Sequence, residues 1–137
     1  MKFENKLVAI LNKDIETGVA MNALAHMAIG LGAHLGKDPL HLETYRDANT
    51  NPYPNISRLP FIILRAKSNE IRKTVMQARE DKIEHTVFLN TMTGGTYLEQ
   101  IEKTQNSPEE ALIFYGCVIF GSWEEVSRIT KKFSLWK

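Results

Sequence analysis

Four mostly apolar runs along the chain have the length and continuity of buried β-strands. They are residues 7–11, 61–64, 86–89 and 112–120. A continuous apolar run is typical of a strand that is covered on both faces of its sheet. Gly116 interrupts the longest run and predicts a bulge or a close approach of another backbone segment. Residues 40–45 alternate apolar and polar positions instead, which predicts a weaker fifth strand at a sheet edge.

Helical periodicity and capping residues predict helices between these strands. The two longest span residues 18–35 and 69–82, and Ser68 is expected to cap the second. Further helix starts are marked by Ser/Thr-x-x-Glu capping boxes. In such a box the hydroxyl accepts from the backbone N–H of the glutamate, and the glutamate side chain accepts from the backbone N–H of the Ser or Thr. These boxes begin at Thr96, Ser107 and Ser122.

Strands that alternate with helices predict an α/β fold, with a mixed, mostly parallel sheet and helices on both of its faces. At 137 residues the chain fits one domain, residues 1–137, because chains divide into domains only at roughly 250–300 residues. Residues 47–60 hold three of the five prolines and are long for a connector. We interpret this segment either as a lid over a site or as a plain surface loop.

Composition narrows the class of protein. Hydrophobic and charged fractions of 43% and 24% are ordinary for a globular chain, and a net charge of +1 argues against nucleic acid as the main partner. The single cysteine, Cys117, has no disulfide partner, and its apolar surroundings indicate a small buried side chain rather than a reactive thiol. The first residues do not form a signal peptide, so we expect a cytoplasmic protein.

The helix expected at residues 18–35 is unusual because residues 17–36 contain no charged side chain. Its apolar content is largely alanine and is interrupted by glycine and polar residues, so we expect a buried helix of a soluble domain, with no membrane span. At ~100° per residue, two sides can be distinguished. The inward side holds Leu24, Met27, Ala28, Leu31 and Leu35, and the opposite side holds Asn22, His26, Ile29, Gly30 and Ala33. We expect residues 47–60, a ligand or a second subunit to cover that opposite side.

Two loops follow strand ends, where open α/β sheets bind their ligands. The first loop, residues 12–18, leads into the start of a helix, whose unpaired backbone N–H groups favour a small anion. The second loop, residues 90–97, is rich in hydroxyls and has two glycines that let the backbone approach a ligand closely. The expected ligand-binding residues are Lys13, Gly18, Thr91, Gly94 and Gly95. The alternative is that the two glycines merely turn the chain into the helix that begins near Thr96.

Asn22 and His26 lie one helical turn apart, so their side chains can act together. We take them, with Thr93, as candidate catalytic residues, in which His26 is the general base and Thr93 or a water molecule is the nucleophile. The alternative is that His26 is a structural residue. The four histidines and the cysteine lack metal-ligand spacing, and we expect neither a metal nor a cofactor.

Several strings resemble a bacterial family of proteins of unknown function that is itself similar to the type II peptidyl-tRNA hydrolases. They are Asn12-Lys-Asp14, T-G-V-A-x-N-x-x-x-H from Thr17 to His26, Tyr115-Gly116, Phe120-Gly121, and T-K-x-x-x-L-W from Thr130 to Trp136. The resemblance covers nearly the whole chain. It implies a three-layer α/β/α, peptidyl-tRNA hydrolase II-like fold with a small mixed sheet, and a homodimer.

The hydrolases carry a Gly-Lys-x-x-x-Gln-x-x-His string at their first helix. Gly18 and His26 match it, but Val19 and Ala23 stand where the lysine and glutamine would be. Residues 91–96 also lack the aspartate of the corresponding hydrolase loop. Losing these groups argues against peptidyl-tRNA hydrolysis. Two hypotheses follow: a domain that binds a small ligand or a partner on a hydrolase-like scaffold, or a hydrolase of another ester or amide. We also expect a homodimer built partly on the charge-free side of the first helix.

Overall fold

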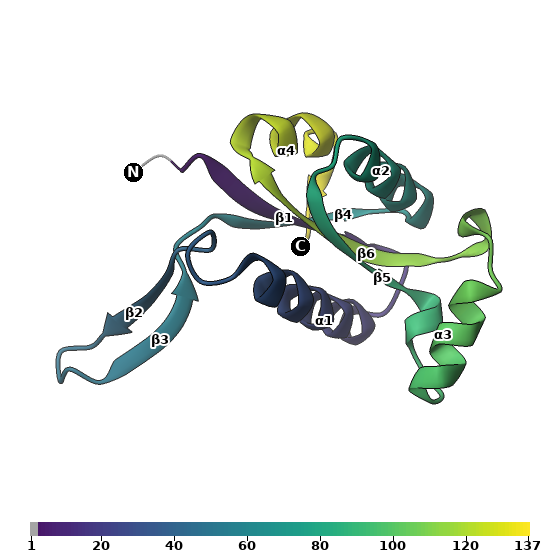
Figure 1. The fold of residues 1–137 in the computed structure, drawn as a ribbon. Helices are drawn as coiled ribbons and strands as arrows, with labels where there is room; N and C mark the ends of the chain where they lie inside the picture. Colours follow the sequence, from purple (N-terminus) through teal and green to yellow (C-terminus); the bar gives the residue numbers. More distant parts are fainter. Residues whose placement is uncertain (1–2) are drawn as a thin grey trace.

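A computed structural model describes residues 3–137. The strands are β1 (Asn5–Asn12), β2 (Leu42–Arg46), β3 (Pro52–Ser57), β4 (Phe61–Ala66), β5 (Glu84–Leu89), β6 (Phe114–Ser122) and β7 (Ser134–Leu135). The helices are α1 (Thr17–Leu35), α2 (Ser68–Glu80), α3 (Tyr97–Gln105) and α4 (Trp123–Thr130), with short 3-10 turns η1 (Asn90–Met92) and η2 (Glu109–Ala111). Figure 1 shows their arrangement. All four strongly predicted strands are present, while β3 and β7 were not predicted.

Five strands form one mixed sheet in the order β5-β6-β1-β4-β7. Only β1 and β4 are parallel neighbours; β6 is antiparallel to both β1 and β5, and β7 is antiparallel to β4. The mixed sheet is as predicted, but the expectation that it is mostly parallel is wrong. Parallel neighbours need a crossover connection. α3 buries no residue and does not cross the sheet. The chain therefore starts β6 at the same edge at which β5 ends, and the two strands are antiparallel.

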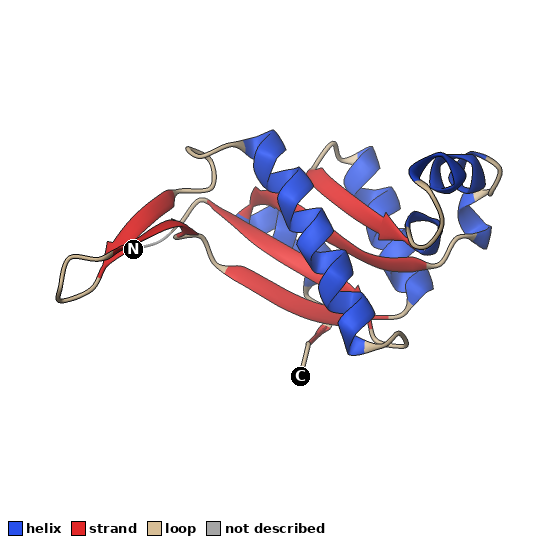
Figure 2. Cartoon of the chain, turned by 90° about the horizontal axis from the view of Figure 1, so that it is seen from below, coloured by secondary structure: helices blue, strands red, loops and turns tan. Residues whose placement is uncertain are grey.

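Helices lie on both faces of the sheet, α1 on one and α2 with α4 on the other (Figures 1 and 2). Successive residues of β1 alternate between the two cores, which explains why this strand is a continuous apolar run. On the α1 side the core includes Leu7, Ala9, Leu11, Ala23, Met27 and Leu31. On the other side it includes Val8, Ile10, Ile71, Val75, Val126 and Ile129.

Cys117 belongs to the core between the sheet and α2 and is 1% exposed, as the sequence indicates. Burial raises the pKa of its thiol to about 12. The thiol therefore stays protonated at neutral pH, and an inert packing role follows.

Gly116 lies at an irregularity in the pairing of β5 with β6, where the register shifts after Phe88. A Cβ atom at this glycine would lie 2.9 Å from the Met27 Cε and 3.0 Å from the carbonyl oxygen of Ile10. Both sequence expectations for this glycine, a bulge and a close approach, are confirmed.

β2 and β3 form a separate antiparallel hairpin that projects from the body of the molecule (Figure 1). The weaker strand predicted at residues 40–45 is confirmed as β2, but it belongs to this hairpin and not to the main sheet. Residues 47–60 hold the hairpin turn and β3 and are not a loop that closes over α1. Asp47 organises the hairpin turn by accepting hydrogen bonds from Asn49, Asn51 and the Tyr53 hydroxyl. The bond from Tyr53, followed by those from Asn51, lowers the pKa of Asp47 to about 2.

Of the three predicted capping boxes, the one at Thr96 is confirmed in full, and Ser122 supplies only the hydroxyl half of its box. The hydroxyls of Thr96 and Ser122 accept from the backbone N–H groups of Glu99 and Glu125 at the starts of α3 and α4. Ser107 is not a cap, because its hydroxyl donates to the Lys103 carbonyl at the end of α3. Ser68 does not cap α2 either; it is the first residue of that helix.

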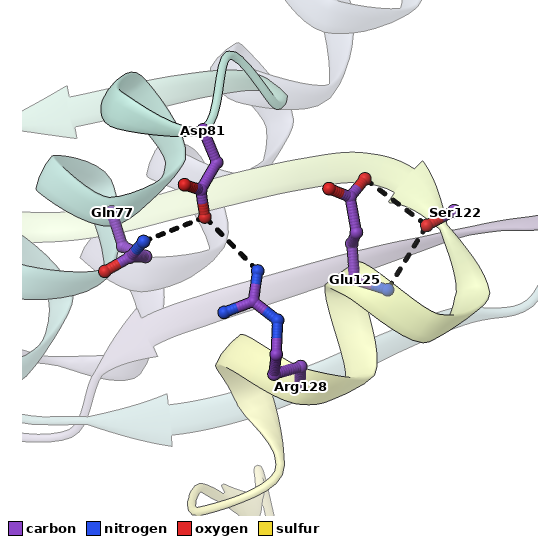
Figure 3. A network of polar contacts seen from close by, with 5 residues as sticks. All are labelled: Gln77, Asp81, Ser122, Glu125 and Arg128. Atoms are coloured by element: carbon purple, nitrogen blue, oxygen red, sulfur yellow. Dashed lines mark hydrogen bonds and ion pairs between the residues drawn. The ribbon is translucent and has the colours of Figure 1, made fainter.

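α2 and α4 are joined by a polar contact at the surface (Figure 3). Arg128 of α4 donates to the Asp81 carboxylate at 3.2 Å, and Gln77 of α2 donates to the same oxygen at 2.8 Å. The bond from Gln77 and then that from Arg128 lower the pKa of Asp81. The two helices on this face thus form one layer.

Candidate functional site

Both loops singled out in the sequence lie at the same edge of the sheet. β1 and β5 run in the same direction because each is antiparallel to β6, so their carboxyl ends and the start of β6 share one edge (Figure 1). Lys13 is exposed there, and its backbone N–H donates to the Ala66 carbonyl at 3.0 Å. Gly18 lies in the first turn of α1, and Glu16 before it gives no side-chain cap. A ligand at these residues stays a prediction.

Two asparagines hold this edge together. Asn12, 2% exposed, donates from Nδ2 to the Phe114 carbonyl at 2.9 Å and accepts at Oδ1 from the Asp14 N–H at 2.8 Å. Asn90 accepts at Oδ1 from the Ile113 N–H at 3.0 Å. The ends of β1 and β5 are therefore both fastened to the chain entering β6. Sequence reasoning gave these residues no role, although an asparagine directly after a buried strand was a usable signal.

The loop after β5 uses its hydroxyls for its own structure. Thr91 is buried and hydrogen bonded to Thr104 at 2.7 Å, and Thr93 donates to the Asn90 carbonyl at 2.8 Å. Gly94 and Gly95 have φ of +72° and +68°, the left-handed region that glycine adopts readily. This geometry supports the alternative in which the glycines turn the chain into α3.

Thr91 also lines an open hollow of about 540 Å³ beside α3. Its other lining residues are Glu99, Glu102, Lys103, Asn106 and Ser107. Two carboxylates face one ammonium group there. An anion is therefore not favoured in this hollow.

The three candidate catalytic residues are not assembled into a reacting group. Asn22 and His26 are both exposed on α1, and the His26 ring stacks on Phe88 of β5 with centroids 5.4 Å apart. Phe88 in turn stacks on Tyr115 of β6 at 6.4 Å. Within residues 3–137, no hydrogen bond joins His26 to Asn22 or to Thr93. Packing on an aromatic ring is what the structural alternative for His26 implies.

The outer face of α1 is the most unusual surface of the molecule. It comprises the exposed residues Met21, Asn22, Ala25, His26, Ile29, Gly30, Ala33 and His34. Met21 and Ile29 are 65% and 69% exposed, and the face carries no Asp, Glu, Lys or Arg. Every residue that the sequence placed on the outward side of this helix is found there.

By length and composition α1 is long and apolar enough to cross a membrane. In the single chain, 22% of its most apolar stretch is buried. Core helices of soluble proteins pass the same test when they are buried. Here the inner side packs on the sheet and the outer side does not. The outer face is thus apolar surface without a cover in one chain.

Two elements project on the same side of the sheet as α1, the β2–β3 hairpin beyond its C-terminal end and α3 to its side (Figures 1 and 2). Both expose large apolar side chains. They are Tyr45, Tyr53 and Ile56 on the hairpin, and Tyr97, Leu98 and Ile101 on α3. The outer face of α1 therefore has two further apolar surfaces on its side of the sheet.

No metal site is evident in the part of the chain that the structure describes. Among these residues, no group of three or more His, Cys, Asp or Glu side chains could hold an ion.

Comparisons with known proteins identify a family and a fold. A family described as a protein of unknown function (DUF2000) matches residues 5–137. A solved structure of the protein of unknown function Atu0240 from Agrobacterium tumefaciens superposes with a TM-score of 0.85 at 22% identity. That likeness covers 99% of this chain and 100% of the other. A search of curated proteins gave no match. At this identity the structural likeness shows a shared fold.

Proposed function

We propose that this chain, which belongs to the DUF2000 family of proteins of unknown function, is a partner-binding domain that pairs with a second copy of itself through the outer face of α1. The observation that carries the proposal is that face: nineteen residues of helix without a charge, with Ile29 at its centre 69% exposed. Contiguous apolar surface of this kind marks an interaction site, because water does not favour it.

Chemistry favours a second copy as the occupant. In a two-fold dimer the same patch meets itself, so any charge near the axis would meet a like charge. The outer face of α1 has no Asp, Glu, Lys or Arg, and at its C-terminal end His34 contacts the Glu84 carboxylate of β5 at 2.9 Å. Ala25, Gly30 and Ala33 keep its profile low, which lets two helices approach closely. The hairpin and α3 project on the same side of the sheet as α1 and expose apolar side chains of their own, which a second copy would also contact.

A lipid surface fits the same face less well. Helices that lie on membranes carry Lys and Arg along their polar side, and α1 has neither. The hairpin and α3 also project beside α1, so a flat surface would meet these elements first (Figure 1).

Ile29→Glu is expected to convert a dimer into a monomer. A glutamate at the centre of the contact buries two like charges without partners, and an unpaired buried charge costs about 3–5 kcal/mol, on the order of a hundredfold or more in the dissociation constant. Ala33→Glu should act in the same way. Light scattering and analytical ultracentrifugation of the purified chain measure the change.

Met76→Glu is the matched control, because Met76 is an exposed apolar residue of α2, on the opposite side of the sheet. It should leave the dimer intact. A wild-type chain that is monomeric at high micromolar concentration would contradict the proposal. Co-sedimentation of the wild type with anionic vesicles, lost in Ile29→Glu, would assign the face to a membrane instead.

We further propose that the scaffold is that of the type II peptidyl-tRNA hydrolases, in three α/β/α layers. Helices on both sheet faces support this, as do Gly18 and His26, which keep the spacing of the hydrolase string at the helix that follows the first strand. The activity is not proposed. Ala23 of α1, at the position of the hydrolase glutamine, is 0% exposed and packs between the helix and the sheet.

Incubation with a peptidyl-tRNA is therefore expected to release no peptide above the uncatalysed rate. The groups that would hold phosphate and transfer protons are replaced by Val19 and Ala23. The measurement is acid-soluble peptide over time, with His26→Ala as the comparison. Turnover by the wild type that disappears in His26→Ala would favour an ester or amide hydrolase.

A further inference from the structure

We propose that a cavity at the base of the β2–β3 hairpin binds a small uncharged molecule with an aliphatic body and one hydrogen-bonding group. The cavity measures about 280 Å³ and is open on one side. It lies between the second half of α1, the segment leading into the hairpin, and the first residues of β1 and β4. Its apolar walls are formed chiefly by Leu7, Leu31, Leu40, Leu42, Phe61 and Val118.

The inner wall belongs to the core, whereas Phe61, 40% exposed, and Asn55 lie at the mouth of the cavity. Leu7, Leu31 and Val118 are 4%, 3% and 1% exposed and are held by packing between α1 and the sheet. Gly32 contributes no side chain, and a Cβ atom there would still stand 3.8 Å from Leu40. The space is therefore present before any ligand arrives, and at about 280 Å³ it lies just below the roughly 300–1,000 Å³ of small-molecule sites.

Apolar walls decide the body of the ligand. Cavities lined by aliphatic and aromatic side chains do not hold water well and take up apolar molecules instead. Within the described chain, no Asp, Glu, Lys or Arg lines this cavity. A charged group placed inside would lose its hydration without gaining a partner, so the ligand is uncharged.

Two polar side chains line the cavity, and one of them is already engaged. The Ser57 hydroxyl donates to the Leu40 carbonyl and accepts from the Leu59 N–H. Asn55 is exposed at the mouth of the cavity and has φ of +63°, and among residues 3–137 its side-chain amide makes no hydrogen bond within the chain. An amide can both donate and accept, so Asn55 fits a single hydroxyl or carbonyl at one end of an apolar molecule.

This site is separate from the proposed dimer contact. Ala28, Leu31 and Gly32 face the cavity, whereas Met21, Ile29 and Ala33 form the exposed outer face. Either proposal can fail without the other, because the cavity is complete within one chain.

The test is a titration of isotope-labelled protein with 1-octanol, followed by amide chemical shifts. We expect saturable shifts at Gly32, Leu40 and Leu42, and binding of octanoate at least tenfold weaker because its carboxylate would be desolvated. Asn55→Ala should weaken 1-octanol binding roughly fivefold, the effect of one neutral hydrogen bond, and leave n-hexane binding unchanged.

Gly32→Leu fills the cavity and should abolish the shifts while leaving Tm unchanged or higher, since leucine favours the helix. Gly30→Leu is the matched control on the same helix: a Cβ atom there meets nothing within 4 Å, and 1-octanol binding should persist whatever the oligomeric state. The proposal is overturned by a wild type without saturable shifts, or by equal shifts in Gly32→Leu. Equal affinity for octanoate, or no effect of Asn55→Ala, would overturn the assigned ligand chemistry.

Discussion

Asn12→Asp is expected to destabilise the chain by about 3–5 kcal/mol at neutral pH, the penalty for an unpaired buried charge. The Asn12 amide donates to the Phe114 carbonyl, and its oxygen accepts from the Asp14 N–H. Aspartate keeps the acceptor but turns a carboxylate oxygen toward a carbonyl oxygen. Both atoms are acceptors in a site that is 2% exposed. Urea unfolding followed by circular dichroism measures the loss.

The effect should depend on pH in a defined direction. Burial and the facing carbonyl raise the folded-state pKa of the introduced carboxyl above the unfolded value of roughly 4. Below that value the acid is protonated and can donate to the Phe114 carbonyl, so the variant approaches the wild type. Stability is then lost as pH rises through the raised folded pKa. A deficit that shrinks as pH rises would contradict this account.

Asn90→Asp is the matched control. Asn90 uses only its oxygen, which accepts from the Ile113 N–H, and a carboxylate can accept the same bond. The expected change in the free energy of unfolding is no more than about 1 kcal/mol. Equal losses in the two variants would mean that the amide donor of Asn12 is not what matters.

Gly116→Ala should cost about 1–3 kcal/mol, the range for overpacking a filled core. The added methyl group would meet the flexible end of Met27, which can move, and the backbone oxygen of Ile10, which cannot move without disturbing β1. Thermal unfolding monitored by circular dichroism is the measurement.

Gly30→Ala is the comparison, because nothing lies within 4 Å of a Cβ atom at that position of α1. Alanine in place of an open helical glycine should stabilise by roughly 0.5–1 kcal/mol. If both alanines had the same effect, the close approach at Gly116 would not be the cause.

The sequence predicted the elements that local chemistry determines. Buried strands such as β1 and β4 are continuous apolar runs, and Thr96 and Ser122 cap their helices through neighbours three residues away. The direction of β6 has no such local signal. It depends on α3 staying at the sheet edge, and the Thr96 box that starts α3 is the same whether the helix crosses the sheet or not.

The hairpin was missed for a different reason. Pro52 and Pro54 lie within β3, and proline cannot donate a backbone hydrogen bond, so the segment was interpreted as a loop. A two-stranded ribbon has a free edge on each strand, where prolines are tolerated. The sequence pattern shows the prolines but not that the strand has only one neighbour.

The candidate site was predicted unevenly. The charge-free side of α1 was located correctly, because 3.6-residue periodicity fixes which side chains point outward. The sequence pattern suggests that the hydroxyls of Thr91 and Thr93 are free to contact a ligand. In the structure both hydroxyls are hydrogen bonded within the chain, to Thr104 and Asn90. The cavity below the hairpin had no signal, since its walls come from segments far apart in sequence.

The central position of β1 has a consequence for how the protein is made. Asn12, at the end of β1, bonds to Phe114, 102 residues later, and β6 is one of the two strands that flank β1. A nascent chain leaving the ribosome therefore carries this apolar strand with one edge open until β6 has emerged. Contacts between such distant segments also form slowly. Folding of the sheet therefore waits until residues 114–122 have been made, and until then the emerging chain exposes one edge of an apolar strand.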